Sequence, residues 1–255
     1  MAVTAHSSEP AMGAPPPPNV AIRTLHDAAD MVEVVEVFKR VWGSKTELVR
    51  LEMLMAISHS GGYVTGVFDT SGPEDVILGA SVALLARYRD QPAVHSHVTG
   101  ILPDSQHSGI GRAVKQHQAA WAADRGLDWI VWTFDPLVRR NAWFNIAVLG
   151  VEVHGYLESF YGEMTDAINV GDQSDRLFVA WHVPSSGSGV LHDGSDIAGA
   201  DLIATPDDIV ALRGTDPAAV ARWRRETRTA LTAALAAGRK IVGFTPDGNY
   251  VVEAA

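Results

Sequence analysis

The sequence predicts an α/β fold, in which strands and helices alternate along a single chain of 255 residues. Three observations carry this prediction. An apolar run leads into an amphipathic helix pattern through a loop that contains Gly109 and Gly111. Strand and helix patterns also alternate on both sides of that loop, and a helix followed by a hairpin pattern ends the chain. Because 47% of the residues are hydrophobic, the chain can bury a full core.

The half before the glycine loop predicts the order strand, helix, helix, strand, strand, strand. Residues 26–42 place charged side chains at helical spacing between apolar ones and predict an amphipathic helix, with a strand as the alternative because the segment is rich in valine. A second helix is expected over residues 47–58, ended by Gly61 and Gly62. Apolar or β-branched runs predict strands at residues 20–25, 63–68, 76–85 and 93–102.

The half after the loop begins with a predicted helix over residues 112–125, which Gly126 ends. Aromatic and β-branched residues predict a buried strand over 127–134. A short helix is expected over 141–149, and a late strand over 176–183.

The ends of the chain have a different character. Residues 1–19 contain a run of prolines and are interpreted as a disordered leader, and the Ser- and Gly-rich residues 184–200 as a linker. Residues 201–255 form a C-terminal extension, with a helix that begins at Asp216-Pro217 and a hairpin over residues 241–252. We expect this extension to pack on the main domain, residues 20–183, or on a second subunit, which leaves a homodimer open.

The glycine loop suits a phosphate, because small residues let backbone amides approach an anion at a helix N-terminus. It is not a P-loop, since Lys115 follows Val114 and not a glycine. A dinucleotide fingerprint would need a third glycine where Val114 stands. The plain alternative is a helix entered through a flexible turn that binds nothing.

The spacing Gln106-x-x-Gly109-x-Gly111 resembles the Arg/Gln-x-x-Gly-x-Gly/Ala signature of the GNAT superfamily of acyl-CoA-dependent N-acyltransferases. The resemblance covers roughly residues 20–183. It implies a mixed sheet flanked by helices, here with the C-terminal helix-plus-hairpin extension, and an acyl-CoA, first of all acetyl-CoA, as co-substrate. The residues that it implies for holding the cofactor are Ile101, Gln106, His107, Ser108, Gly109, Ile110, Gly111, Arg112 and Asn141.

The same resemblance implies that the acyl group moves to the amine of a small molecule or amino acid by direct attack. His95 is the first candidate for the base, because it lies on the strand before the loop, and His97 shares its face by the period of two. Both are equally explained as half-buried strand residues. Where many members place a tyrosine that protonates the thiolate, this chain has Ile146, so Tyr156 and Tyr161 are candidate substitutes, unless they serve packing alone. Ile146 also motivates the alternative of a non-catalytic acyl-CoA-binding or regulatory module.

Composition excludes several other functions. The formal charge of -10 and the isoelectric point near 5.4 argue against a nucleic-acid partner. The absence of cysteine excludes thiolate catalysis and cysteine metal sites, and it suits the cytoplasm. No apolar run reaches the length of a membrane span, and the histidines show no metal-binding spacing. Arg139 and Arg140 are candidates for recognising a substrate carboxylate, or are solvated loop charges.

Overall fold

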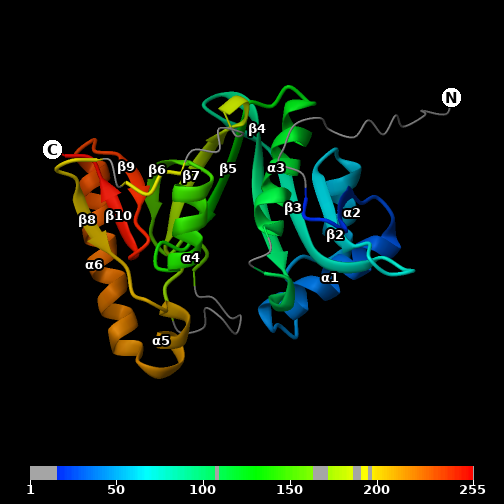
Figure 1. Cartoon of the computed structure of the whole chain (residues 1–255), viewed down its shortest axis with the longest axis horizontal. Helices are drawn as coiled ribbons and strands as arrows, with labels where there is room; N and C mark the ends of the chain where they lie inside the picture. The colour runs from blue at the N-terminus through cyan, green and yellow to red at the C-terminus, as the bar shows by residue number, and fades with distance from the viewer. Residues whose placement is uncertain (1–15, 107–108, 163–171, 186–190, 195–196, 255) are drawn as a thin grey trace.

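The computed structural model describes residues 16–106, 109–162, 172–185, 191–194 and 197–254. Within these residues, strands form a seven-stranded sheet in the order β1-β2-β3-β4-β5-β7-β6 and a three-stranded sheet in the order β8-β10-β9 (Figure 1). The strands of the large sheet are β1 (Val20–Thr24), β2 (Tyr63–Asp69), β3 (Val76–Tyr88), β4 (Gln91–Ile101), β5 (Trp129–Phe134), β6 (Glu152–Leu157) and β7 (Arg176–His182).

Helices cover both faces of the large sheet. α1 (Ala28–Trp42) and α2 (Leu51–His59) pack on one face of β2, β3 and β4, in a core that includes Phe38 and Val82. α3 (Ile110–Ala123) packs on the opposite face. α4 (Arg139–Ala142) continues into a π-helix, Trp143–Val148, which packs in the same core as α3.

β4 and β5 are the one parallel pair among the described strands of the large sheet, and they separate soon after they meet. Their pairing covers Val94 with Ile130 and His95 with Val131. On the other edge of β4 a bulge leaves His97 outside the ladder with β3. We call the two segments that follow the last β4–β5 pair, residues 96–101 and 132–134, the wedge. The edge of β4 in the wedge has backbone groups without a β5 partner, and such groups need another partner when buried.

The C-terminal extension shares the core of the main domain. Its elements are β8 (Asp201–Ala204), α5 (Ile209–Thr215), α6 (Pro217–Ala236), β9 (Ile241–Phe244) and β10 (Asn249–Val252). Leu231 of α6 and Tyr250 of β10 belong to the same buried cluster as Trp132 of β5. Figure 1 shows α6 and the small sheet on the side of the molecule that carries β6 and β7.

The predicted order before the glycine loop is confirmed, and residues 28–42 form a helix, not the alternative strand. Gly43, in the left-handed conformation, ends this helix, and its backbone N–H donates a hydrogen bond to the Lys39 carbonyl. The predicted C-terminal helix and hairpin are also confirmed. The helix predicted over residues 141–149 is confirmed as helical, but it begins at Arg139 and most of it is a π-helix, Trp143–Val148. β6, β8 and α5 were not predicted. β6 lacks a clear alternation because its pairing shifts between Val153 and Gly155.

Candidate active site

The N-terminus of α3 begins at a glycine in the left-handed conformation. Its N-cap, Gly109, has a φ of 84°, and a Cβ there would meet no heavy atom within 4 Å, so the glycine serves the backbone conformation and leaves open space. The amides that follow, at Ile110, Gly111 and Arg112, have no carbonyl of their own helix to bond. His107 and Ser108, expected in the same loop, lie outside the described residues.

The other residues expected at the cofactor differ in how the fold uses them. The Gln106 side-chain amide donates to the Ile101 carbonyl over 2.9 Å, so it braces the loop against the end of β4. The Nε atom of Arg112 is buried without a hydrogen-bond partner among the described residues. A Cβ on Gly111 would lie 3.9 Å from the ring of Phe144, in ordinary contact with the π-helix. Asn141 is exposed on α4.

The two histidines of β4 lie on the sheet face opposite α3. The ring centroids of His95 and His97 are 6.5 Å apart, while Ser96 between them bonds to Lys115 of α3. His95 is half-buried, and burial, with smaller contributions from His97 and Lys115, lowers its pKa below the ordinary value. It is therefore neutral at pH 7 and able to accept a proton.

The two candidate tyrosines lie on opposite faces of the sheet. The Tyr161 hydroxyl is 3.4 Å from Oγ1 of Thr133. By alternation along β5, Thr133 shares the face of Val131, the neighbour of His95. Tyr156 and Phe134 are both register partners of Leu177 on β7, so Tyr156 lies on the other face of the sheet. Its hydroxyl donates to Asp175 over 2.6 Å. The fold thus brings Tyr161 to the histidine face and engages Tyr156 elsewhere.

A buried lysine, which the sequence did not single out, lies at the start of the wedge. The Nζ atom of Lys115 donates to Oγ of Ser96 over 2.8 Å and lies 3.9 Å from the centroid of the Trp132 ring. Burial lowers the pKa of Lys115 to about 7. A charged residue directly after Val114, on the apolar side of a helix, is the signal that could have found it.

The π-helix also contacts the wedge, from the face of the sheet that α3 covers. Ile146 is buried in the main core and offers no proton. Asn145 is also buried, and its Oδ1 atom accepts from Nε1 of Trp132 over 3.2 Å. The asparagine that faces the wedge is therefore Asn145, not the exposed Asn141. π-Helical turns are frequent at functional sites, where they re-aim side chains.

The charged residues after β5 bind the C-terminal extension. Arg139 donates to the Thr205 carbonyl over 2.6 Å and pairs with Asp207 at 2.6 Å. Asp135 accepts from Arg224 of α6 and Arg213 of α5. Arg139 and Asp135 therefore hold the extension, and Arg139 is engaged where a substrate carboxylate was considered.

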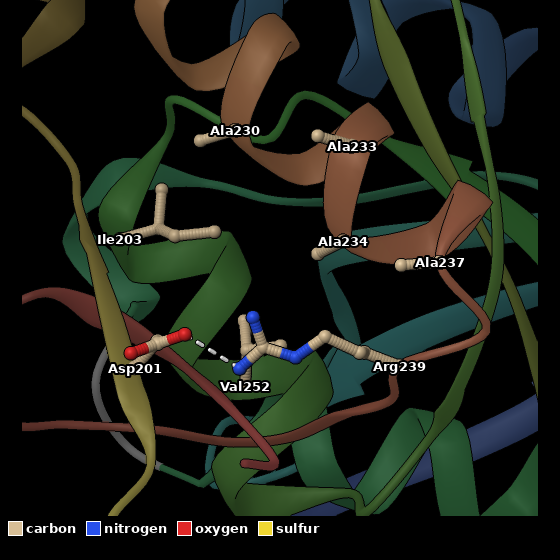
Figure 2. Close-up of a pocket in the computed structure, with 8 residues that line it drawn as sticks. All are labelled: Asp201, Ile203, Ala230, Ala233, Ala234, Ala237, Arg239 and Val252. Carbon is tan, nitrogen blue, oxygen red and sulfur yellow. Dashed lines mark ion pairs between the residues drawn. The ribbon is translucent and has the colours of Figure 1, made fainter. Parts of the chain in front are cut away.

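A separate cavity of about 270 Å³ lies between α6, β8 and β10 (Figure 2). Arg239 and Asp201 form an ion pair of 2.7 Å at its rim, and Figure 2 shows alanines of α6 along its wall. Its lining residues include no candidate site residue, so among the described residues it is distinct from the wedge. In the same part of the chain, no group of three His, Asp or Glu is arranged to hold a metal. No described helix combines the length and apolar character that crossing a bilayer requires.

Comparison by sequence finds no relative, since no protein-family model and no curated protein matches the chain. Comparison by structure finds proteins of similar fold. A phosphinothricin acetyltransferase of the GNAT superfamily from Sinorhizobium meliloti, in complex with acetyl-CoA, matches with a TM-score of 0.51 and 19% identity over 67% of this chain and 90% of that one. Arabidopsis thaliana Naa50, with the bisubstrate analogue CoA-Ac-MVNAL, matches with a TM-score of 0.50 and 14% identity over 64% and 97%.

A third solved structure, the ribosomal-protein-S5-alanine acetyltransferase from Vibrio fischeri, matches with a TM-score of 0.50 and 17% identity over 66% of this chain and 95% of that chain. These structures are nearly covered, whereas about a third of this chain lies outside each match. The separated β4–β5 pair lies within the large mixed sheet, and the glycine-capped α3 is one of the helices that cover its faces. The chain therefore has the fold of the GNAT superfamily of acetyltransferases, with additional C-terminal helices and a small sheet.

Proposed function

We propose that the protein is an N-acyltransferase, which moves an acyl group, first of all acetyl, from acyl-CoA to the amine of a small molecule or amino acid. One observation carries the proposal. Among the described residues, the edge of β4 in the wedge has no β5 partner; it follows directly after the half-buried His95 and leads, at its C-terminal end, to the glycine-capped start of α3. An extended, amide-containing molecule that ends in a pyrophosphate fits this order of histidine, strand edge and helix N-terminus.

The proposed contacts use backbone groups. Amides at Ile110, Gly111 and Arg112 would hold the pyrophosphate, as helix N-termini hold anions. The free edge of β4, residues 96–101, would pair with the amides of the pantetheine arm, as an added strand would. Because backbone groups make these contacts, they depend little on side-chain type, which is consistent with the low sequence identity to the similar structures.

His95 is the proposed base. The attacking amine must lose a proton as its nitrogen bonds to the thioester carbon, and a neutral imidazole near the end of the β4–β5 pairing can take it. His97 on the adjacent bulge is the second candidate, and Tyr161 shares this face. We place the acceptor on this side of the sheet, opposite α3.

The cofactor claim has a direct test in calorimetric titration with acetyl-CoA. Gly109→Asp adds a carboxylate at the proposed anion site, and Gly126→Asp is its matched control. Both glycines have positive φ angles and open space around a Cβ. We expect saturable binding in the wild type and in Gly126→Asp, and its loss in Gly109→Asp. Equal binding by both variants, or none by folded wild type, would contradict the proposal.

Activity can be followed by release of free CoA, because the chain has no cysteine and gives no thiol background. The acceptors to compare are phosphinothricin, the peptide MVNAL and a peptide that begins with alanine, which represent the amines named for the three similar structures. Glycine and other free amino acids extend the panel. An acyltransferase releases CoA faster with one of these amines than without, whereas a binding module binds acetyl-CoA and releases none.

A further inference from the structure

Lys115 is a buried lysine that forms no ion pair with an acidic side chain among the described residues. Its Nζ atom donates to Ser96 Oγ over 2.8 Å and to Gln118 Oε1 over 3.3 Å, and lies over the Trp132 ring. Lys115 is 6% exposed. No described Asp or Glu lies within ion-pair distance of it. Fully buried lysines are rare without an acidic partner, because desolvation of the ammonium costs several kcal/mol.

The position of this amine relates it to the proposed reaction. Ser96 and Trp132 are the first residues of the wedge, directly after the paired His95 and Val131. Lys115 approaches them from α3, on the face opposite His95. A base on one face and an ammonium group on the other therefore lie on opposite sides of the point where β4 and β5 separate.

A thioester that reacts there would need both groups. As the acceptor nitrogen bonds to the carbonyl carbon, the carbon–sulfur bond breaks and its electron pair stays on sulfur. Ile146 offers no proton to that sulfur, and Tyr156 already donates to Asp175. We propose that Lys115 is the acid of this reaction, which gives an Nζ proton to the departing CoA thiolate. This inference rests on the proposed function.

The step is balanced. The amine's proton passes to His95, and the thiolate becomes CoA thiol with the proton from Lys115. Protonated His95 then releases its proton to solvent and neutral Lys115 takes one up from solvent, which restores both groups. Burial supports this role, because it lowers the pKa of Lys115 to about 7 and lets both forms exist near neutrality. Among the described titratable groups, His95 couples to it, and the side chains that contact its Nζ atom, Ser96, Gln118 and Trp132, are uncharged.

The test compares two acyl donors in Lys115→Met and Lys115→Arg. Acetyl-CoA needs a proton on its leaving sulfur, whereas 4-nitrophenyl acetate leaves a phenolate that is stable without one. With the best amine of the panel, we expect Lys115→Met to lower kcat for acetyl-CoA about 100-fold or more, within the range of general acid catalysis. The rate with 4-nitrophenyl acetate and the affinity for CoA should stay unchanged. In Lys115→Arg, kcat for acetyl-CoA should fall by the same factor, since arginine keeps its proton.

Lys39→Met, at a partly exposed lysine of α1 that pairs with Glu36, is the control for loss of a lysine. The inference is overturned if Lys115→Met keeps its kcat, if both donors slow equally, or if Lys115→Arg retains full activity, because charge alone would then suffice. Wild-type protein that binds acetyl-CoA and releases CoA, together with any of these outcomes, leaves the proposed function standing. Wild-type protein that releases no CoA removes both.

Discussion

Arg224 of α6 forms a two-point ion pair with Asp135, the residue that follows β5: Nη1 lies 2.7 Å from Oδ1 and Nη2 3.1 Å from Oδ2. The side chains are 1% and 7% exposed. Arg224 also bonds Asp172, and Arg213 of α5 bonds both carboxylates. This buried network joins the C-terminal helices to the end of the strand that borders the wedge.

Asp135→Asn should lower the free energy of unfolding by about 3 kcal/mol, because it leaves buried guanidinium groups of Arg213 and Arg224 without full compensation. Denaturation in urea measures the change. Asp207→Asn is the matched control, since Asp207 is 94% exposed in its pair with Arg139 and should contribute little. Equal stability of the two variants would show that the network is dispensable.

The effect of Asp135 should depend on pH in a defined direction. Burial favours a higher pKa for this carboxyl, but Arg224 and Arg213 outweigh it and hold the pKa below the ordinary value. A carboxyl with a lowered folded-state pKa stabilises fully above its unfolded pKa, near 3.9, and the contribution is lost as the pH falls further. The difference between wild type and Asp135→Asn should therefore shrink below about pH 4 in urea titrations. A constant difference down to pH 2 contradicts this.

Lys115→Met should stabilise the protein near pH 7. The pKa of Lys115 is lowered from 10.5 to about 7, so the folded state binds fewer protons than the unfolded state between these values. The loss of folding stability caused by burying the charged lysine is complete below pH 7, and it decreases as the pH rises toward 10. Unfolding by urea at pH 6.5 and pH 9.5 should show a larger gain for the variant at the lower pH. A gain that is the same at both values would mean that the lysine stays charged.

His95→Gln should lower kcat about 100-fold or more without changing acetyl-CoA affinity, because it removes the proposed base and no backbone contact. The wild-type rate should fall on acidification with a midpoint below about 6.5, since the pKa of His95 is lowered. Release of CoA measured from pH 5 to 8 checks both. His97→Gln is the comparison, and a larger loss there would reassign the base.

The two tyrosines should separate stability from rate. Tyr156→Phe removes a hydrogen bond to the buried Asp175 and should cost about 1 kcal/mol of stability with kcat unchanged. Tyr161→Phe removes a 3.4 Å contact at an exposed side chain and should change neither quantity. Thermal unfolding and CoA release measure both. A large fall in kcat in either variant would assign the acid to that tyrosine instead of Lys115.

Sequence patterns predicted the elements that repeat a simple period or carry a strong end signal. The helix at 28–42, the strands before the loop and the Asp216-Pro217 start of α6 are examples, and the Asp216 side chain does accept from the Ala219 amide. β6 escaped because it is short and bulged, and β8 because four residues carry too little pattern.

The candidate site was only partly readable for a different reason. The loop glycines are local signals, so the N-terminus of α3 could be located from the chain alone. The meeting of Lys115 with Ser96 and Trp132 depends on how a helix and two strands pack, which no local spacing encodes. The same holds for Tyr156, whose side of the sheet depends on a bulge.

The brief pairing of β4 with β5 has a mechanical consequence. The large sheet is continuous in outline, yet Val94, His95, Ile130 and Val131 provide the described pairs that join its two parts. A ligand seated along the free edge of β4 would act as a missing strand and stiffen that junction. Amide hydrogen exchange in β4 and β5 should then slow when acetyl-CoA is bound. The co-substrate would thus fill a strand position in the sheet that forms its own binding site.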